Sequence, residues 1–164
     1  MRLFLGAFAT IDYYGLVKER FSFVQGKWVE RHNLHLTYLF LGEHPTPYPI
    51  IEKLEGIQYE KKKIVLSGIG FFGNPPKVLY AKAEDETIER LHQEIIARLG
   101  IAPDKPFLPH VTLCRIKKVP KFSRFIETVR KYQHQRLGSL TSELVLIESF
   151  LTPKGPKYRV IHTF

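Results

Sequence analysis

Two turns rich in proline and glycine constrain the fold of this chain more than any other feature. The first turn, residues 73–76, separates the apolar segments 63–70 and 77–83, and the second, residues 153–156, separates the last two apolar segments of the chain. A short turn joins neighbouring strands when they run antiparallel, whereas parallel neighbours need a long crossover. The sequence therefore favours an α+β fold with antiparallel sheets over a doubly wound parallel fold.

Apolar periodicity predicts the remaining elements. The expected strands are residues 2–8, 28–30, 34–41, 63–70, 77–83, 111–116, 142–150 and 158–164. The expected helices are residues 12–23, 50–54, 87–99 and 122–132. Asp12 is placed to cap the first helix, and Gly100 is placed to end the third. No low-complexity linker divides the chain, so we expect a single domain over residues 1–164, built as two lobes.

The charge of the chain indicates a polyanionic partner. Lys and Arg number 25 against 16 Asp and Glu, which gives a formal net charge of +9. Such an excess attracts nucleic acid, although basic charge can also serve solubility alone. The single cysteine, Cys114, excludes a disulfide within the chain and a zinc site built on cysteines. One cysteine alone also favours a reducing compartment, so we expect a cytoplasmic protein. No window approaches the roughly 20 apolar residues of a membrane span, so we expect no membrane segment.

Two His-x-Thr motifs, His35-Leu36-Thr37 and His110-Val111-Thr112, lie within expected strands. Successive side chains of a strand point to opposite faces, so each His shares a face with its Thr, and the residue between them points into a core. One His-x-Thr arises readily by chance. Two copies in apolar strands, one in each half of the chain, favour a shared site over isolated structural histidines.

This pairing suits phosphoryl chemistry. A neutral imidazole can accept a proton from water, and a protonated imidazole can donate one to a leaving oxygen. A threonine hydroxyl can donate to a non-bridging phosphate oxygen. This chemistry needs no cofactor, and no His or carboxylate spacing in the chain indicates a metal site.

Other residues carry weaker signals. His92, within the third helix, and His134 are expected at the surface. His32 and His44 flank the first motif and are expected to be ordinary surface residues, with contact to a phosphate or a base as the alternative. Lys61–Lys63 is expected to be a solvated strand entry, with RNA-backbone contact as the alternative. The aromatic residues Phe71, Phe72 and Tyr80 are expected in the core, with base stacking as the alternative.

With these motifs, the chain resembles the 2H phosphoesterase superfamily, and more narrowly the RNA 2′,3′-cyclic phosphodiesterases, historically called 2′-5′ RNA ligases. The segments that carry the resemblance are residues 2–5, 28–29, 33–37, 40–43, 109–115 and 155–158. The resemblance implies a bilobal, pseudo-two-fold symmetric α+β fold, with helices packed outside antiparallel sheets and a central cleft lined by both motifs.

The resemblance also assigns roles. It implies that His35 and His110 are catalytic and that Thr37, Thr112 and Arg115 bind the substrate phosphate. Arg115 lies three residues after Thr112, so in a regular strand their side chains would point to opposite faces. A bulge or a strand end is therefore expected between them. In the family, water attacks opposite the 3′ oxygen and leaves a 2′-phosphate, and the resemblance favours His110 as base and His35 as acid.

The implied activity is metal-independent hydrolysis of RNA 2′,3′-cyclic phosphate ends to 2′-phosphate ends. The expected partner is RNA with such an end, tRNA fragments included, and the expected state is a monomer. One alternative is 2′-5′ ligation of tRNA halves, which is the reaction run backwards with a hydroxyl in place of water. The other is a non-catalytic module that binds RNA ends. Two proton-transfer groups favour catalysis, because binding alone does not need them.

Overall fold

The computed structural model describes residues 1–164 as a mixed α+β fold. The strands are β1 (Arg2–Ile11), β2 (Gln25–Trp28), β3 (His35–Glu43), β4 (Lys63–Ser67), β5 (Ile69–Phe72), β6 (Val78–Lys82), β7 (His110–Lys118), β8 (Arg136–Thr141), β9 (Val145–Thr152) and β10 (Gly155–Thr163). The helices are α1 (Tyr14–Arg20), η1, a 3-10 turn (Arg31–Asn33), α2 (Tyr48–Leu54), α3 (Glu86–Leu99) and α4 (Phe122–Lys131). No helix has the length and apolar character needed to cross a membrane.

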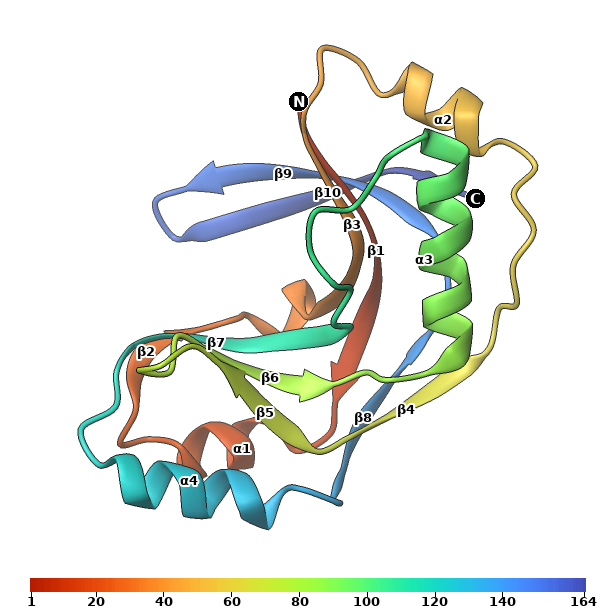
Figure 1. Ribbon diagram of the computed structural model, residues 1–164. Helices are drawn as coiled ribbons and strands as arrows, with labels where there is room; N and C mark the ends of the chain where they lie inside the picture. Colours follow the sequence, from red (N-terminus) through yellow and green to blue (C-terminus); the bar gives the residue numbers. More distant parts are fainter.

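The strands form one curled antiparallel sheet, which confirms the expected fold class (Figure 1). The strand order along its main path is β10-β9-β1-β3-β7-β6-β5. Strand β2 pairs with the C-terminal half of β7. The far end of β1 pairs with β8, which in turn pairs with β4. Both expected hairpins are present, as β5-β6 and β9-β10. Strands β3 and β7 therefore stand at the centre of the path, with β1 and β6 as their outer neighbours.

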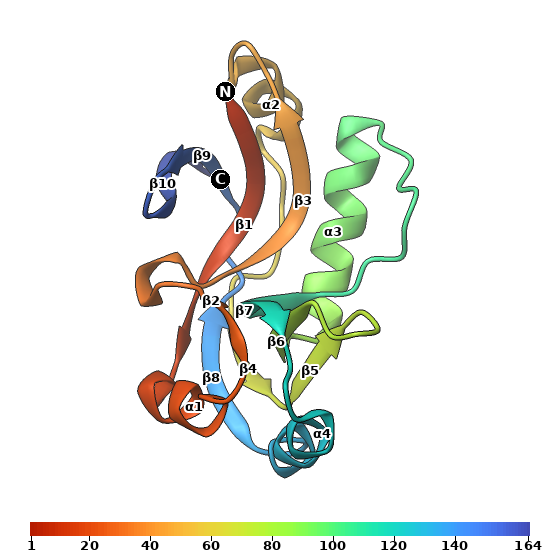
Figure 2. The ribbon, with the colours of Figure 1, turned by 90° about the vertical axis from the view of Figure 1, so that its left-hand side faces the viewer.

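The helices cover the outside of this sheet. α3 runs beside β3, α2 packs at the top of α3, and α1 and α4 lie together at the opposite end of the molecule (Figures 1 and 2). A cluster of 34 buried residues fills the space between helices and sheet. The apolar stripe of α3 is buried as its spacing predicts: Ile88, Leu91, Ile95 and Leu99. Gly100, with φ of 65°, ends α3.

Three expectations about these elements are wrong. Residues 63–70 are not one strand, because Gly68 takes a φ of 87° that breaks the extended chain, so that β4 pairs with β8 while β5 pairs with β6. Strand β8 is absent from the expected set, since its apolar alternation is weak. Asp12 does not cap α1, because its carboxylate instead accepts from Arg136 Nη1 at 2.6 Å.

Candidate active site

A single Cα pair, Leu36 with Val111, joins β3 to β7. These are the central residues of the two His-x-Thr motifs, and both side chains are fully buried. The antiparallel register about this pair sets the His of each motif opposite the Thr of the other. The strand-parity prediction is confirmed: all four polar side chains lie on one face of the sheet, which we call the motif face. They are His35, Thr37, His110 and Thr112.

A β-bulge brings Arg115 to the motif face. Thr112 and Cys114 pair with consecutive residues of β6, so Leu113 between them has no partner. Leu113 and Cys114 are consequently both buried, and the exposed positions shift by one so that Arg115 follows Thr112 on the same face. The bulge expected from the position of Arg115 is confirmed.

The first motif contains the same irregularity. Thr37 and Leu39 pair with consecutive residues of β1, so Tyr38 bulges and is buried. Phe40 then reaches the surface with 54% of its area exposed. The two motifs thus share their local backbone form, and they differ at the fifth residue after the histidine, which is Phe40 in one and Arg115 in the other.

Both motif histidines are held by the backbone in the same way. His35 Nδ1 lies 2.7 Å from the carbonyl oxygen of Asn33, and His110 Nδ1 lies 2.6 Å from that of Leu108. A carbonyl oxygen can only accept, so Nδ1 carries the proton and donates it in both rings. In each neutral ring, Nε2 is therefore left unprotonated and available for proton transfer.

Asn33, which holds His35, is itself hydrogen-bonded to a segment near the C-terminus. Asn33 is buried, and its side-chain Nδ2 donates to the carbonyl oxygen of Pro156 at 2.9 Å. Tyr158 of β10 and Phe4 of β1 flank the His35 ring, at centroid distances of 5.1 and 4.9 Å. The first motif is thus fixed by β1 and by the β9-β10 hairpin.

Two aromatic rings flank His110 as well. Phe72 of β5 and Tyr80 of β6 stack on one another at 4.3 Å, and their centroids lie 5.0 and 5.4 Å from that of His110. These two residues are therefore part of the site, while Phe71 packs against the core residue Phe125 as expected. A pocket of about 430 Å³ adjoins this ring pair, lined by Phe72, Tyr80, Glu84, Asp85, Glu86, Glu89, Phe107, Leu108 and Pro109.

Burial and charge both disfavour protonation of the two rings. Burial lowers the pKa of His35; the hydrogen bond to Asn33 raises it, and the positive charges of Arg115 and His110 lower it further. Burial also lowers the pKa of His110, with Leu108 raising it and Arg115 lowering it. The pKa of each histidine is therefore lowered from its ordinary value.

His92 is not at the surface, and this prediction is wrong. It is 4% exposed, its Nδ1 lies 2.9 Å from the carbonyl oxygen of Tyr38, and it stacks on Phe107 at 3.9 Å. The proline-rich loop before β7 covers this face of α3, which the helix pattern alone does not reveal. The position of His92 four residues after Ile88, within the apolar stripe, is the signal that could have found it.

The remaining candidates lie outside this arrangement. His134 is exposed as expected. His32 is exposed beside Glu30, and Nε2 of His44 bonds the carbonyl oxygen of Leu41. In the charge run, Lys61 pairs with Glu143 at 2.9 Å and Lys62 with Asp85 at 3.8 Å, as expected of a solvated strand entry. No group of three or more His, Cys, Asp or Glu side chains is placed to hold a metal ion.

The amino-acid sequence matches a known protein family and several named relatives. The model of the 2′-5′ RNA ligase superfamily matches residues 18–149. An RNA 2′,3′-cyclic phosphodiesterase of Archaeoglobus fulgidus is 34% identical over 181 aligned positions, which cover 100% of this chain and 99% of the relative. A protein of the same name from Methanocaldococcus jannaschii is 31% identical and covers 98% of each chain.

Solved structures share the fold. The structure of TT0787 from Thermus thermophilus superposes with a TM-score of 0.75 at 32% identity, covering 100% of this chain and 97% of its own. The structure of E. coli LigT complexed with 3′-AMP has the same TM-score of 0.75 at 18% identity, covering 99% of this chain and 96% of its own. The second likeness concerns the fold alone.

Proposed function

Because the chain belongs to the 2′-5′ RNA ligase superfamily, we propose that it is a phosphodiesterase that hydrolyses RNA 2′,3′-cyclic phosphate ends to 2′-phosphate ends. One observation carries the proposal. Two histidines on one face of the sheet are both held through Nδ1 by backbone carbonyls, and they leave two Nε2 atoms for proton transfer. Relatives that span the whole chain bear the name of this activity.

In the proposed reaction, His110 acts as base and His35 as acid. Neutral Nε2 of His110 takes a proton from water as the water oxygen bonds to phosphorus. The bond between phosphorus and the 3′ oxygen breaks on the opposite side, and protonated Nε2 of His35 gives its proton to that oxygen. The products are a 3′-hydroxyl and a 2′-phosphate, and the two histidines have exchanged protonation states.

The other groups on the motif face stabilise the charge on the phosphate. The hydroxyls of Thr37 and Thr112 donate to non-bridging oxygens, and the guanidinium of Arg115 supplies the positive charge. These donors and the imidazolium meet the phosphate charge together, so the proposed reaction proceeds without a metal ion.

The test is turnover of a short RNA that ends in a 2′,3′-cyclic phosphate, with mass and end-group analysis of the product. We expect a 2′-phosphate end, and an unchanged rate under strong chelation. His35→Ala and His110→Ala should each lower kcat by about 10²–10⁴-fold, because each removes one proton-transfer partner. Thr37→Ala and Thr112→Ala should cost less, since each removes a neutral donor.

His134→Ala serves as the matched control, because His134 is exposed and lies outside the site. Full activity in folded His35→Ala and His110→Ala proteins would contradict the site assignment. A rate lost under chelation and restored by added divalent metal would contradict metal independence. A joined RNA product would indicate ligation, and tight binding without turnover would indicate the non-catalytic module.

A further inference from the structure

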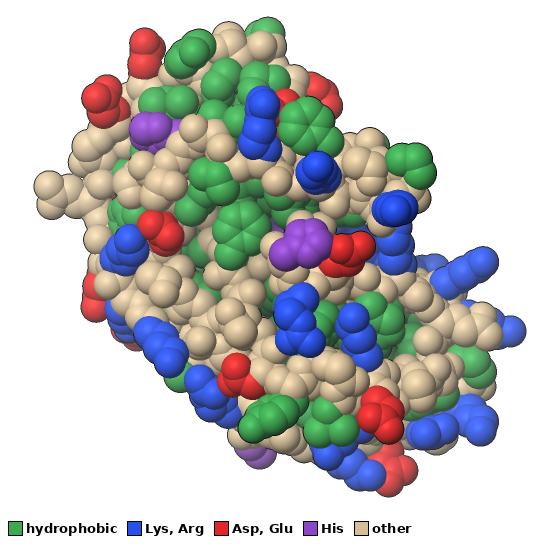
Figure 3. Space-filling model, turned by 180° about the vertical axis from the view of Figure 1, so that it is seen from behind, with side chains coloured by type: hydrophobic (Ala, Val, Ile, Leu, Met, Phe, Trp, Pro, Cys, Tyr) green, Lys and Arg blue, Asp and Glu red, His purple; other side chains and the backbone are tan.

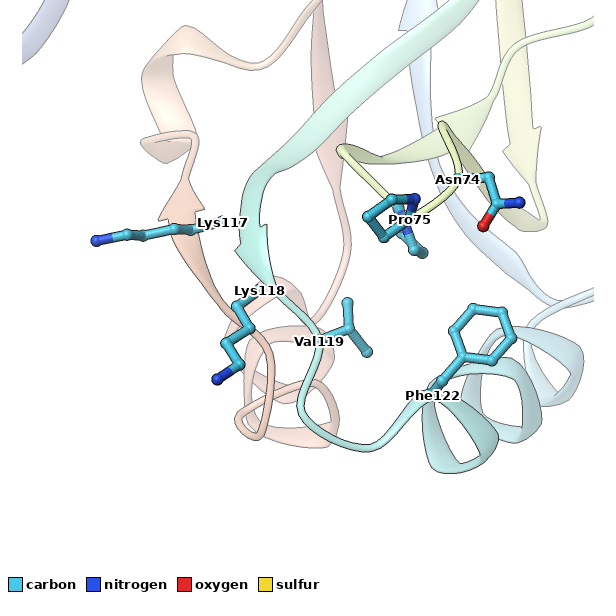
Figure 4. A pocket seen from close by; sticks show the side chains of 7 residues that line it. Asn74, Pro75, Lys117, Lys118, Val119 and Phe122 are labelled. Atoms are coloured by element: carbon cyan, nitrogen blue, oxygen red, sulfur yellow. The ribbon is translucent and has the colours of Figure 1, made fainter.

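A second pocket lies at the C-terminal end of β7, beyond Arg115. This pocket has a volume of about 360 Å³ and lies between the β5-β6 turn, the end of β7 and the start of α4 (Figure 4). After the bulge, Arg115 and Lys117 are exposed while Ile116 between them is buried. Arg115 and Lys117 therefore share a face, roughly 7 Å apart along the strand. Lys117 is also one of the residues that line the pocket.

The interior of the pocket fits a flat apolar group. The ring of Phe122 lies across the pocket from Pro75, with Val119 between them on the strand side (Figure 4). Phe122 is 51% exposed, so part of its ring is open to a stacking partner. A nucleobase stacks on such a ring whatever its identity. The side-chain amide of Asn74 at the rim offers both a donor and an acceptor to a base edge.

The rim of the pocket is positively charged. Lys117 and Lys118 extend outward from the strand end, away from the interior (Figure 4). Both are exposed, and neither takes part in an ion pair. Free ammonium groups beside an apolar slot match a nucleotide, whose phosphates are charged and whose base is not.

The opposite end of β7 has the opposite charge. Beyond His110, the pocket beside Phe72 and Tyr80 is lined by Glu84, Asp85, Glu86 and Glu89. Asp85 pairs with Lys62 and Glu86 with Arg90, whereas Glu84 and Glu89 are in no ion pair. Phosphates are repelled from that end and attracted to the Lys117 end. Seen from behind, Lys and Arg side chains also gather over the end of the molecule that carries α1 and α4, interspersed with a few acids (Figure 3).

We propose that the RNA strand runs from the phosphate site along β7 toward Lys117 and Lys118, and that a base on the 5′ side of the cyclic phosphate stacks on Phe122. The identity of the ligand as RNA rests on the proposed function. The direction of the strand and the stacking position rest on the charge difference along β7 and on the shape of the pocket.

The test compares two probes: a pentaribonucleotide ending in a 2′-phosphate and a nucleoside 2′-monophosphate. Binding is measured by fluorescence anisotropy and calorimetry on the full chain, so the readout does not depend on turnover. Phe122→Ala should weaken pentaribonucleotide binding about tenfold, a change of about 1.4 kcal/mol that one stacked base supplies. The Lys117→Gln, Lys118→Gln double variant should weaken it and flatten its salt dependence. Monophosphate binding should change less than about twofold in both.

Tyr48→Ala and Lys53→Gln on α2 are the matched controls, because both residues are exposed at the end of the molecule opposite α4 (Figure 1). Equal binding of the pentaribonucleotide by Phe122→Ala and wild type would overturn the proposal. Equal weakening of both probes would also overturn it, since the variant would then have disturbed the phosphate site. The two proposals can fail separately. If the wild-type protein turned over no cyclic phosphate while Phe122→Ala still bound the pentaribonucleotide more weakly than wild type, the proposed function would be refuted and this inference would stand.

Discussion

The decisive atoms of the site are two carbonyl oxygens. Those of Asn33 and Leu108 accept from Nδ1 of the motif histidines and so determine which nitrogen of each ring can exchange protons. No acidic side chain orients either ring among the hydrogen bonds of the site. A neutral carbonyl raises a histidine pKa less than a carboxylate would, so burial and Arg115 prevail and the pKa of both rings falls.

At this scale we predict how Arg115 affects titration. Arg115→Ala removes a positive charge that disfavours both imidazolium forms, so the pKa of His35 and of His110 should rise. With one base and one acid, the pH profile of kcat/KM is expected to be bell-shaped and to report the free enzyme. Both limbs of this profile should shift to higher pH in Arg115→Ala. The measurement is the pH profile together with NMR titration of the two rings. Arg115→Lys keeps the charge and is the control. Unchanged or lower values in Arg115→Ala would contradict the prediction.

Among the elements, α3 and the loop before β7 hold the two motifs in relation to one another. His92 of α3 bonds the carbonyl oxygen of Tyr38, next to Thr37, and stacks on Phe107, next to Leu108. One buried side chain on a covering helix thus contacts the residue that follows the first motif and the residue three positions before the second.

We predict that His92→Ala destabilises the protein. The substitution leaves the buried carbonyl of Tyr38 without its donor and opens a cavity against Phe107, which should lower the free energy of unfolding by about 2 kcal/mol or more. The measurement is the urea midpoint. Turnover should fall less than in His110→Ala, because the proton-transfer groups remain. His134→Ala is the control, and an equal midpoint in the two variants would disprove a structural role for His92.

How much of this could be predicted from the sequence depends on how local each feature is. The parity of the motifs and the apolar stripe of α3 follow from spacing along one strand or helix. The bulge before Arg115 is expected only because the family resemblance gives Arg115 a role that its spacing from Thr112 does not fit. Strand β8 does not follow from local spacing, because its partners β1 and β4 lie far away in sequence and supply its apolar contacts. Asp12 is misplaced for the same reason, because its partner Arg136 comes from a distant segment. His92 is different, because its place within the apolar stripe of α3 is a local signal of burial.

The whole molecule is asymmetric in charge around a nearly symmetric frame. The two motifs share the form of their bulges, but carboxylates gather beyond His110 and free lysines beyond Arg115. The net charge of +9 is therefore unevenly distributed between the two ends of β7. A long-range field of this kind guides a polyanion before any contact forms.

At this scale we predict a salt dependence that grows with substrate length. RNA binding releases counterions, with a slope of about −0.7 per phosphate contacted for single strands in a plot of log affinity against log salt. The pentaribonucleotide should therefore show a steeper slope than a nucleoside monophosphate, because its extra phosphates reach the lysines at the end of β7. Titrations at several salt concentrations measure both slopes. Equal slopes would count against an extended basic contact.

The repeated bulge has a consequence for the isomer that the reaction releases. A cyclic phosphate has two ester bonds to the ribose, and two histidines held alike by backbone carbonyls offer by themselves no reason to cleave one rather than the other. The equivalence ends at the fifth residue after each histidine, where the bulges present an aromatic ring on β3 and a guanidinium on β7. For the proposed reaction we therefore expect Phe40 and Arg115 to influence which of the two ester bonds breaks, because the two motifs differ there in charge and shape.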